Sequence, residues 1–444
     1  MRSLGRKSGC RSQSRAGSVR AARAVLAIAI PCALALSPGG VRATPFSSAG
    51  WGWWWDVGDP AALGRGGTSV AVRSYGASAD LNPATIALAE RGYGFTSYAG
   101  EIADSRGGDG DPEGSFRQKA DLLPRLGGVI ELPRGLRAGG SFSVQSDGTY
   151  ERAQRYAGDV TGPYELKTKG MGGLHRIQVA LAGSSLDRRL LWGVSVGRVQ
   201  GSVKEFLTYN FDDAEERDQL QVVRARLRGG AVATGGVLLL PTEGVAVGAS
   251  GTLGGSSRLI QEVEVLRTGD YDASWTGRQE LPDRWAAGVE LRPIKRLGLS
   301  ADLIRTLWSE AALRAAPGGA SRRPFHDTTR WGAGLEYDFV RGEIPQWTIR
   351  GGVSGSSHHV RAVDPPGAAA RDDAAESEGG SASGKDVRET VASVGLRRLV
   401  AKNRAAVDLA IEWGKRGDAE RVGLEESFAR VSLGITFSST QRDY

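Results

Sequence analysis

Apolar and polar residues alternate along the chain from about Gly92 to its C-terminal end. The alternation is clearest in segments whose odd-numbered positions are apolar and whose even-numbered positions are largely polar or small: 285–292, 331–339, 405–413 and 429–437. Successive residues of a β-strand point to opposite faces. The pattern therefore predicts strands with one face suited to lipid and one suited to a polar interior.

The predicted strands are joined alternately by short turns and by longer polar connections. They cover about 92–104, 116–132, 135–150, 170–185, 189–211, 217–240, 242–257, 274–292, 296–312, 326–340, 344–358, 387–400, 402–416 and 425–439. Short turns fall near Pro133, Leu186, Pro241, Pro293, Arg341 and Lys402. Outer-membrane barrels have an even number of strands, short periplasmic turns and long external loops.

We therefore expect an all-β fold, a membrane-spanning antiparallel β-barrel of about 14 strands. Alternation alone would also fit a soluble β-sandwich, and 258–270 could extend two strands beyond the membrane. No segment after Ala43 approaches the ~18 continuous apolar residues of a membrane helix. A membrane protein without such helices must close its sheet, because unpaired backbone groups cannot face lipid.

The N-terminal region has the features of an export signal. Basic residues up to Arg23 precede the apolar run 24–36, and Val41-Arg42-Ala43 has the small residues of a cleavage site. An N-terminal membrane anchor would need about 20 apolar residues, and this run is shorter and contains Pro31. We expect residues 1–43 to be a removed signal peptide and the mature chain to begin at Thr44, in the cell outer membrane.

Removal of residues 1–43 changes the charge balance, because eight of the 57 basic residues and none of the 50 acidic residues lie there. The formal net charge falls from +7 to −1, so basicity gives no support for a nucleic-acid partner. Cys10 and Cys32 are lost as well. The mature chain then has no thiol for disulfides, zinc or nucleophilic catalysis.

No catalytic or metal motif is evident. The four histidines, His175, His326, His358 and His359, lack metal-ligand spacing, and no Gly-x-Ser-x-Gly elbow is present. His358 and His359 are adjacent, and adjacent strand residues point to opposite faces. We expect no enzyme, no metal and no cofactor; an enzyme assembled from Ser, His and acidic residues on different strands is the remaining alternative.

The segment 44–91 precedes the predicted barrel, 92–444, and contains its most specific motifs. Gly64, Gly66 and Gly67 permit close packing and backbone conformations closed to other residues. Pro83 holds Asn82 extended and can begin a short helix at Ala84. These features suit a compact plug, or hatch, inside the lumen, although an ordinary turn and helix outside the barrel would also fit them.

Several segments resemble the FadL/TodX-type outer-membrane transport proteins, with the related PorV-type barrels second. The Gly-rich stretch 59–72 followed by Asn82-Pro83-Ala84 is similar to the start of these proteins. Residues 281–293, 301–309, 414–417 and 432–437 are similar to their later strands. The chain departs from the pattern at Thr85-Ile86, where Gly-Leu or Gly-Met is commoner, and ends in Asp443-Tyr444 beyond Phe437. Tyr444 could supply the terminal aromatic residue that barrel-assembly machinery often reads in this family.

Four tryptophans near the mature N-terminus are candidate ligand-binding residues: Trp51, Trp53, Trp54 and Trp55. Large aromatic rings in a leading segment need burial or an apolar ligand. In the resembled family this segment enters the barrel beside a hydrophobic ligand pocket, so the rings would line or seal that pocket. The alternative is that they anchor the chain at the periplasmic membrane interface.

The resemblance implies an outer-membrane channel for passive, ligand-gated uptake of hydrophobic small molecules such as long-chain fatty acids or hydrocarbons. The expected partners are that ligand, outer-membrane lipid and the barrel-assembly machinery. The alternative function is a PorV-like barrel that docks or shuttles secreted proteins. A nonspecific porin is a third possibility, against which a lumen filled by a hatch would argue.

Overall fold

The structure is a computed structural model. It describes residues 51–55, 58–73, 80–89, 92–107, 116–158, 162–212, 219–266, 271–311, 313–314, 325–341, 344–359, 386–401, 404–419 and 424–438. The expected signal peptide, 1–43, lies outside these residues. All described residues belong to one compact unit, Val41–Tyr444.

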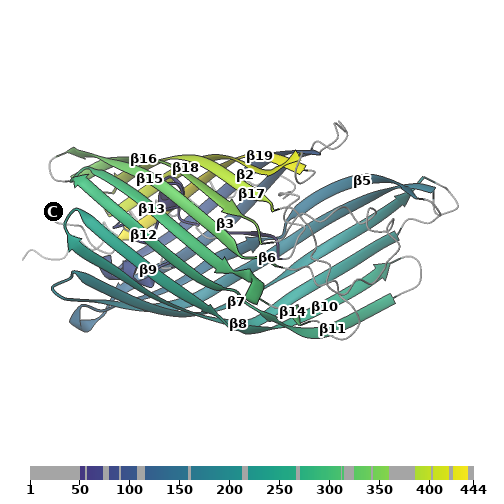
Figure 1. Cartoon of the computed structure of the whole chain (residues 1–444), viewed down its shortest axis with the longest axis horizontal. Helices are drawn as coiled ribbons and strands as arrows, with labels where there is room; N and C mark the ends of the chain where they lie inside the picture. The colour runs from purple at the N-terminus through teal and green to yellow at the C-terminus, as the bar shows by residue number, and fades with distance from the viewer. Residues whose placement is uncertain are drawn as a thin grey trace, which may run out of the picture. The chain divides into compact units, whose positions relative to one another are not determined.

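The described strands form one antiparallel sheet that closes on itself, because β19 pairs with β2 (Figure 1). The first half of the barrel is β2 (Tyr93–Gly107), β3 (Phe116–Glu131), β4 (Arg137–Asp147), β5 (Tyr150–Gly158), β6 (Gly162–Ser185), β7 (Leu190–Phe211), β8 (Gln219–Thr242), β9 (Val245–Gly254) and β10 (Ser256–Leu266). The second half is β11 (Tyr271–Glu280), β12 (Asp283–Ile294), β13 (Leu297–Leu307), β14 (Leu313–Arg314), β15 (Thr328–Arg341), β16 (Ile344–Ser357), β17 (Arg388–Val400), β18 (Ala405–Asp418) and β19 (Leu424–Ser438). Interrupted strands counted once, the described wall is a barrel of 14 strands, which confirms the predicted fold class.

The two faces of each strand differ as the alternation predicted. Trp285 of β12 is 54% exposed on the outer surface, whereas Glu290 of the same strand is 2% exposed and points inward. On β15, Trp331 is likewise exposed and Glu336 is buried. The outer face is therefore apolar, and the inner face carries the charged side chains. Among the described helices none is long and apolar enough to cross a membrane.

On one side of the barrel the wall continues beyond the other strands at the long-loop end (Figure 1). The extension consists of β5, β10, β11 and the outer parts of β6, β7 and β8, which pair with one another. The wall bends at its base, where Gly172, Gly201 and Gly229 have positive φ angles of 103°, 155° and 84°. Glycine adopts such angles without the strain that a Cβ would cause.

The extension explains where the predicted strand bounds were wrong. β6 begins at Gly162, eight residues before the predicted start, and β10 and β11 fill most of the stretch 258–280. These residues lie beyond the apolar band, so their outer face need not be apolar. The sequence alternation weakens there, although the hydrogen-bonded ladder continues.

The described ladder is incomplete on one side of β3. β3 pairs with β2 along most of its length, but with β4 only over Arg125–Glu131. β5 pairs with β6 alone. Among the described strands, the long-loop half of β3 therefore has no hydrogen-bonded neighbour on the β5 side.

Candidate functional site

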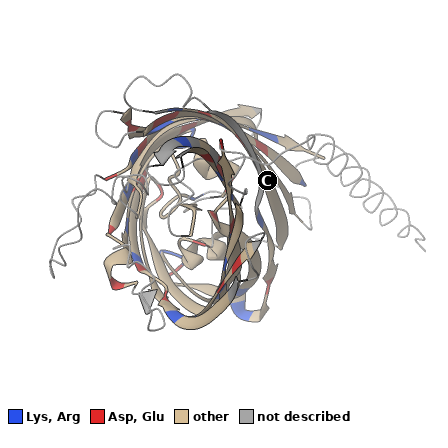
Figure 2. Cartoon of the chain, turned by 90° about the vertical axis from the view of Figure 1, so that its right-hand side faces the viewer, with Lys and Arg blue, Asp and Glu red and all other residues tan. Residues whose placement is uncertain are grey.

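A hatch formed by described residues between Trp51 and Ala89 runs through the lumen, as Figure 2 shows in a view from the long-loop end. Its first element, β1 (Trp53–Trp54), pairs with Ser146 and Asp147 at the outer end of β4. The short helix α2 (Pro60–Leu63) and the 3₁₀ helix η2 (Pro83–Leu88) follow. The carbonyl of Ala89 accepts a 2.6 Å hydrogen bond from Arg137 at the short-turn end of β4. The segment therefore passes from the long-loop end to the short-turn end.

The hatch backbone follows inward-facing glycines of the barrel wall. A Cβ would overlap a hatch residue at six of these positions and would contact one tightly at Gly395: Gly193 (Pro83), Gly236 (Asn82), Gly248 (Val70), Gly332 (Gly66), Gly334 (Arg65), Gly352 (Gly66) and Gly395 (Gly64). We call these seven wall residues the glycine track. Protein interiors are close-packed, so even one added methyl group is felt. The track therefore fixes the path of the hatch through the lumen.

The motif glycines have the geometry that their sequence suggested. Gly66 and Gly67 have φ angles of 66° and 74°, which turn the chain after α2. Gly64 instead has helical angles and lies against the backbone of Gly395. Gly66 and Gly67 thus allow the turn of the backbone, and Gly64 allows a close approach to the wall.

Asn82 connects three parts of the site. Its Nδ2 donates to the carbonyl of Val70 in the hatch at 2.8 Å and to the carbonyl of Val237 in the wall at 3.0 Å. Its Oδ1 accepts from the amide of Ala84 at 3.1 Å, which caps η2, and Pro83 occupies the first helical position. The Asn-Pro-Ala motif therefore starts a short helix inside the barrel, and the alternative of a turn and helix outside it is wrong.

Wall carboxylates hold the central hatch. Asp302 Oδ2 accepts from the amides of Ser69 at 2.5 Å and Val70 at 2.8 Å. Glu336 accepts from Arg65 at 3.0 Å and also pairs with Arg350 on the neighbouring strand. Charge-assisted hydrogen bonds are roughly twice as strong as neutral ones. The inward-facing charges thus bind the hatch instead of lining an aqueous channel.

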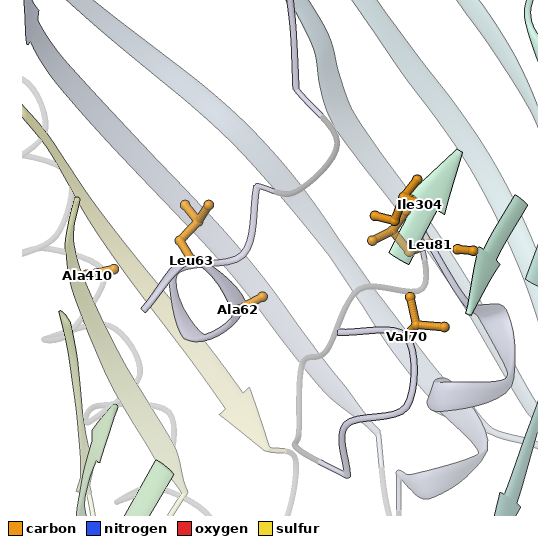
Figure 3. Packing of buried hydrophobic residues seen from close by; sticks show 7 residues of the cluster. Ala62, Leu63, Val70, Leu81, Ile304 and Ala410 are labelled. Atoms are coloured by element: carbon orange, nitrogen blue, oxygen red, sulfur yellow. The ribbon is translucent and has the colours of Figure 1, made fainter. Parts of the chain in front are cut away.

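Apolar contacts complete this central region, as Figure 3 shows. Ala62 and Leu63 of α2 belong to the same buried cluster as Ala410 of β18. Val70 and Leu81 lie beside Ile304 of β13 in that cluster. The hatch therefore shares a small hydrophobic core with two separate strands of the wall, β13 and β18.

The four candidate tryptophans lie at the long-loop end of the lumen. Trp51 packs in an apolar cluster with Leu174, Val199, Leu227, Val232, Leu259 and Leu281. Trp53 and Trp55 are buried beside Arg416 and Arg430, whose guanidinium carbons lie 4.6 and 4.2 Å from the respective ring centroids. Such geometry is that of a cation–π contact. Buried rings in the lumen exclude the alternative that this segment anchors the chain at the periplasmic interface.

A second aromatic group continues this layer. Trp54 meets Trp308 edge-on with centroids 4.9 Å apart, and Trp308 stacks on His359 at 4.1 Å. Trp53 stacks on His358 at 4.8 Å. We call Trp51, Trp53, Trp54, Trp55, Trp308, His358 and His359 the aromatic layer.

The expectation that His358 and His359 point to opposite faces is wrong. β16 ends at Ser357, so the pair lies beyond the strand, where the period-two rule no longer applies. Both imidazoles are buried, with ring centroids 4.4 Å apart. Within the described residues no group of three or more His, Cys, Asp or Glu could hold a metal ion.

Burial shifts the pKa of one imidazole at the long-loop end of the site. Desolvation lowers the pKa of His359 well below its ordinary value, and neighbouring His358 and His326 lower it further. His359 is therefore neutral at pH 7, and its uncharged ring stacks on Trp308.

The structure brings the hatch motif residues and the four tryptophans into one lumen, but it does not test whether the tryptophans bind a ligand. Sequence reasoning missed Trp308, Arg416, Arg430 and the glycine track. Trp308 directly follows β13, in a segment that resembled the transport proteins, and this was the available signal. The glycine track had no such signal, because in the sequence a glycine that faces the hatch cannot be told from a glycine that only permits curvature of the wall.

Solved structures with this fold include two toluene transporters and a FadL homologue. The toluene transporter TodX of Pseudomonas putida matches with a TM-score of 0.57, 16% identity, and coverage of 87% of this chain and 98% of that one. A FadL homologue of Pseudomonas aeruginosa matches with a TM-score of 0.55, 14% identity, and coverage of 90% and 100%. The toluene transporter TbuX of Ralstonia pickettii matches with a TM-score of 0.54, 15% identity, and coverage of 85% and 97%.

No protein-family model matches the sequence, and no curated protein is significantly similar to it. At 14–16% identity, the structural matches establish that the chain has the fold of the FadL/TodX-type proteins. The expected fold is therefore confirmed over most of the chain after residue 50. What the channel carries is a separate question, because one fold can support different functions.

Proposed function

We propose that the protein is an outer-membrane channel for passive, ligand-gated uptake of hydrophobic small molecules. The proposal rests on one observation: a hatch closes the lumen, and the long-loop end of that hatch lies in the aromatic layer. An apolar ligand that enters from the loops would meet the tryptophan and imidazole rings of this layer, beside which Arg416 and Arg430 lie. Burial of apolar surface at about 25 cal/mol per Å² would drive capture.

The solved structures support the class of cargo. TodX and TbuX are described as toluene transporters, and each is covered almost completely by the match to this chain. We extend that class of cargo to small hydrocarbons and fatty acids. The protein that transports them would be the mature, exported chain that has lost residues 1–43. The barrel-assembly machinery would insert it into the outer membrane. These structures give the protein-docking alternative no support, and the proposal contains no enzymatic step.

The hatch must move, or the ligand must leave through the wall, because the centre of the lumen is filled by α2, η2 and their wall contacts. The wall offers a route at the long-loop half of β3, where the described ladder has no partner on the β5 side. An apolar ligand that leaves there would enter the membrane without crossing the ion pairs of Arg65 and Glu336. Net inward flux still requires a sink inside the cell.

The test is mass spectrometry of lipid extracts from detergent-purified protein, combined with toluene uptake into vesicles that contain it. Wild type is compared with a variant carrying Ala at Trp51, Trp53, Trp54 and Trp55. A matched control carries Ala at four outward-facing aromatic residues: Trp331, Phe339, Trp347 and Trp413. We expect the lumen variant to lose a bound apolar compound and at least tenfold in uptake, and the control to keep both. Equal uptake by the two variants would exclude the ligand role.

A further inference from the structure

A row of arginines crosses the outer surface of the wall. Arg228 of β8 lies directly opposite Arg258 of β10, and Arg258 lies directly opposite Arg278 of β11. Residues directly opposite in an antiparallel pair share a face and have Cβ atoms about 5 Å apart. All three side chains are exposed. We call these residues the arginine row.

Like charges placed directly opposite one another destabilise a sheet. In the described part of the chain no ion pair offsets the repulsion within the row, because Arg228, Arg258 and Arg278 form none there. Glu262, four residues beyond Arg258 on the same face, is already paired with Arg224 at 3.0 Å and Arg226 at 3.3 Å. Glu280 is the neighbouring carboxylate on β11, so positive charge remains in excess along the row. Something anionic outside the chain would offset it.

The row lies just beyond the lipid-facing band. From Ala231 to Leu239 the outward positions of β8 are Ala231, Ala233, Gly235, Val237 and Leu239. This nine-residue stretch matches the roughly 9–11 residues with which a tilted strand crosses a bilayer. Arg228 follows at the end nearer the long loops, which are external in outer-membrane barrels. The row is therefore at the level of the headgroups of the outer leaflet.

A groove indents the band below the row. It has a volume of about 430 Å³ and is lined by small residues, among them Gly235, Ala249 and Gly251, with Trp285 and Leu303 at its sides. A side chain added at Gly235 would meet nothing within 4 Å, so the floor is open to the membrane. Arg305, opposite Trp285, is at its edge.

The groove and the row are separated by a distance that one lipid can span. Gly235 and Arg228 are seven residues apart on β8, or about 23 Å along an extended strand. We propose that this face binds a phosphorylated, multiply acylated lipid of the outer leaflet, the chemistry of lipid A. Its phosphates contact Arg228, Arg258 and Arg278, and one acyl chain lies in the groove. Guanidinium groups suit phosphate because they offer paired donors and a permanent charge.

The test measures lipid A by mass spectrometry on protein purified in mild detergent, and its rebinding to delipidated protein. One variant carries Arg228→Gln, Arg258→Gln and Arg278→Gln. The control removes three exposed arginines at the short-turn end: Arg134→Gln, Arg189→Gln and Arg398→Gln. Both must keep the heat-dependent gel mobility of a folded barrel, which outward-facing substitutions should not alter.

We expect wild type and control to retain about one lipid A per barrel and the arginine-row variant to retain at least tenfold less. Gly235→Phe should weaken rebinding severalfold, because the ring fills the groove while the row is intact. Inorganic phosphate alone should not compete at millimolar concentration, since it lacks the acyl chains. Equal loss in both arginine variants, or no lipid A on wild type, would overturn the proposal.

Discussion

Arg416 and Glu101 form two parallel hydrogen bonds of 2.7 and 2.9 Å, although one residue is on β18 and the other on β2. The strand between them is β19, so the pair spans the seam at which the barrel closes. The same guanidinium also donates to Glu426 and Glu389 and lies over the ring of Trp53. One buried side chain therefore joins the seam to the hatch.

Loss of this arginine should destabilise the whole barrel. Arg416→Gln removes a buried cation that Glu101, Glu389 and Glu426 share and leaves Glu101 with Arg430, and breaking a buried pair in this way typically costs about 3–5 kcal/mol. The measurement is the free energy of unfolding by urea titration in lipid vesicles. Lys415→Gln is the control, because its ion pair with Glu425 is exposed and should contribute less than about 1 kcal/mol. Similar losses in the two variants would contradict the role given to Arg416.

A side chain on the glycine track should displace the hatch. The Cβ of Gly352→Val falls on the backbone of Gly66 and Arg65, whereas the Cβ of the adjacent Gly351→Val has no neighbour closer than 3.9 Å. An Ala62→Cys reporter, fully buried in the closed hatch, supplies the readout by maleimide labelling. We expect Gly352→Val to increase the labelling rate at least tenfold and Gly351→Val to leave it unchanged. Unchanged labelling in Gly352→Val would show that the track does not seat the hatch.

The two functions of Asn82 can be separated by substitution. Asn82→Ala removes both the η2 cap and the donors to Val70 and Val237, and an unsatisfied buried group costs about 1–3 kcal/mol. Asn82→Asp keeps the acceptor for Ala84 but sets a second oxygen against two carbonyls. Hydrogen exchange at the Ala84 and Thr85 amides should accelerate in both variants. If Asn82→Asp exchanges as slowly as wild type, the donor bonds do not hold the hatch.

Acid should loosen the aromatic layer. Because the pKa of His359 is lowered in the folded state, the unfolded chain binds its proton at higher pH. Stability is therefore fully present above the ordinary histidine value of about 6.5 and falls as the pH drops below it. Tryptophan fluorescence between pH 8 and pH 5 should follow this loss. His359→Phe keeps a ring against Trp308 and should remove most of the pH dependence; an unaltered profile would assign it to another group.

Export should remove both thiols. If cleavage follows Ala43, the intact mass of protein isolated from the outer membrane corresponds to Thr44–Tyr444, and thiol titration of the unfolded protein gives zero. A retained N-terminal segment would instead show two thiols, from Cys10 and Cys32.

The wall was largely predictable because lipid imposes a simple rule on it. Predicted strands at 344–358 and 387–400 agree within a residue or so with β16 and β17, where Trp347 and Val394 face outward. The extension was foreseen only as a possibility at 258–270, where β10 and β11 lie, and β5 was missed, since outside the bilayer neither face has to be apolar.

The interior was predictable in outline only. The motif around Asn82 indicated a plug, but the contact of Asn82 with Val237 and that of Ser69 with Asp302 depend on which strands curve round to meet the plug. Likewise, His358 and His359 become neighbours of Trp53 and Trp308 only because the residues that follow β13 and β16 lie beside the start of the hatch. Such pairings join positions far apart in the sequence, and strand periodicity contains no information about them.

The glycine track also has a consequence for the order of events during assembly. A hatch that fills the lumen and follows one narrow path cannot be threaded through a barrel that has already closed. The segment directly precedes β2, and β2 is one side of the closing seam. The seam with β19 must therefore close around a hatch that is already in place, so the first part of the chain to fold inward determines when the last strand can dock.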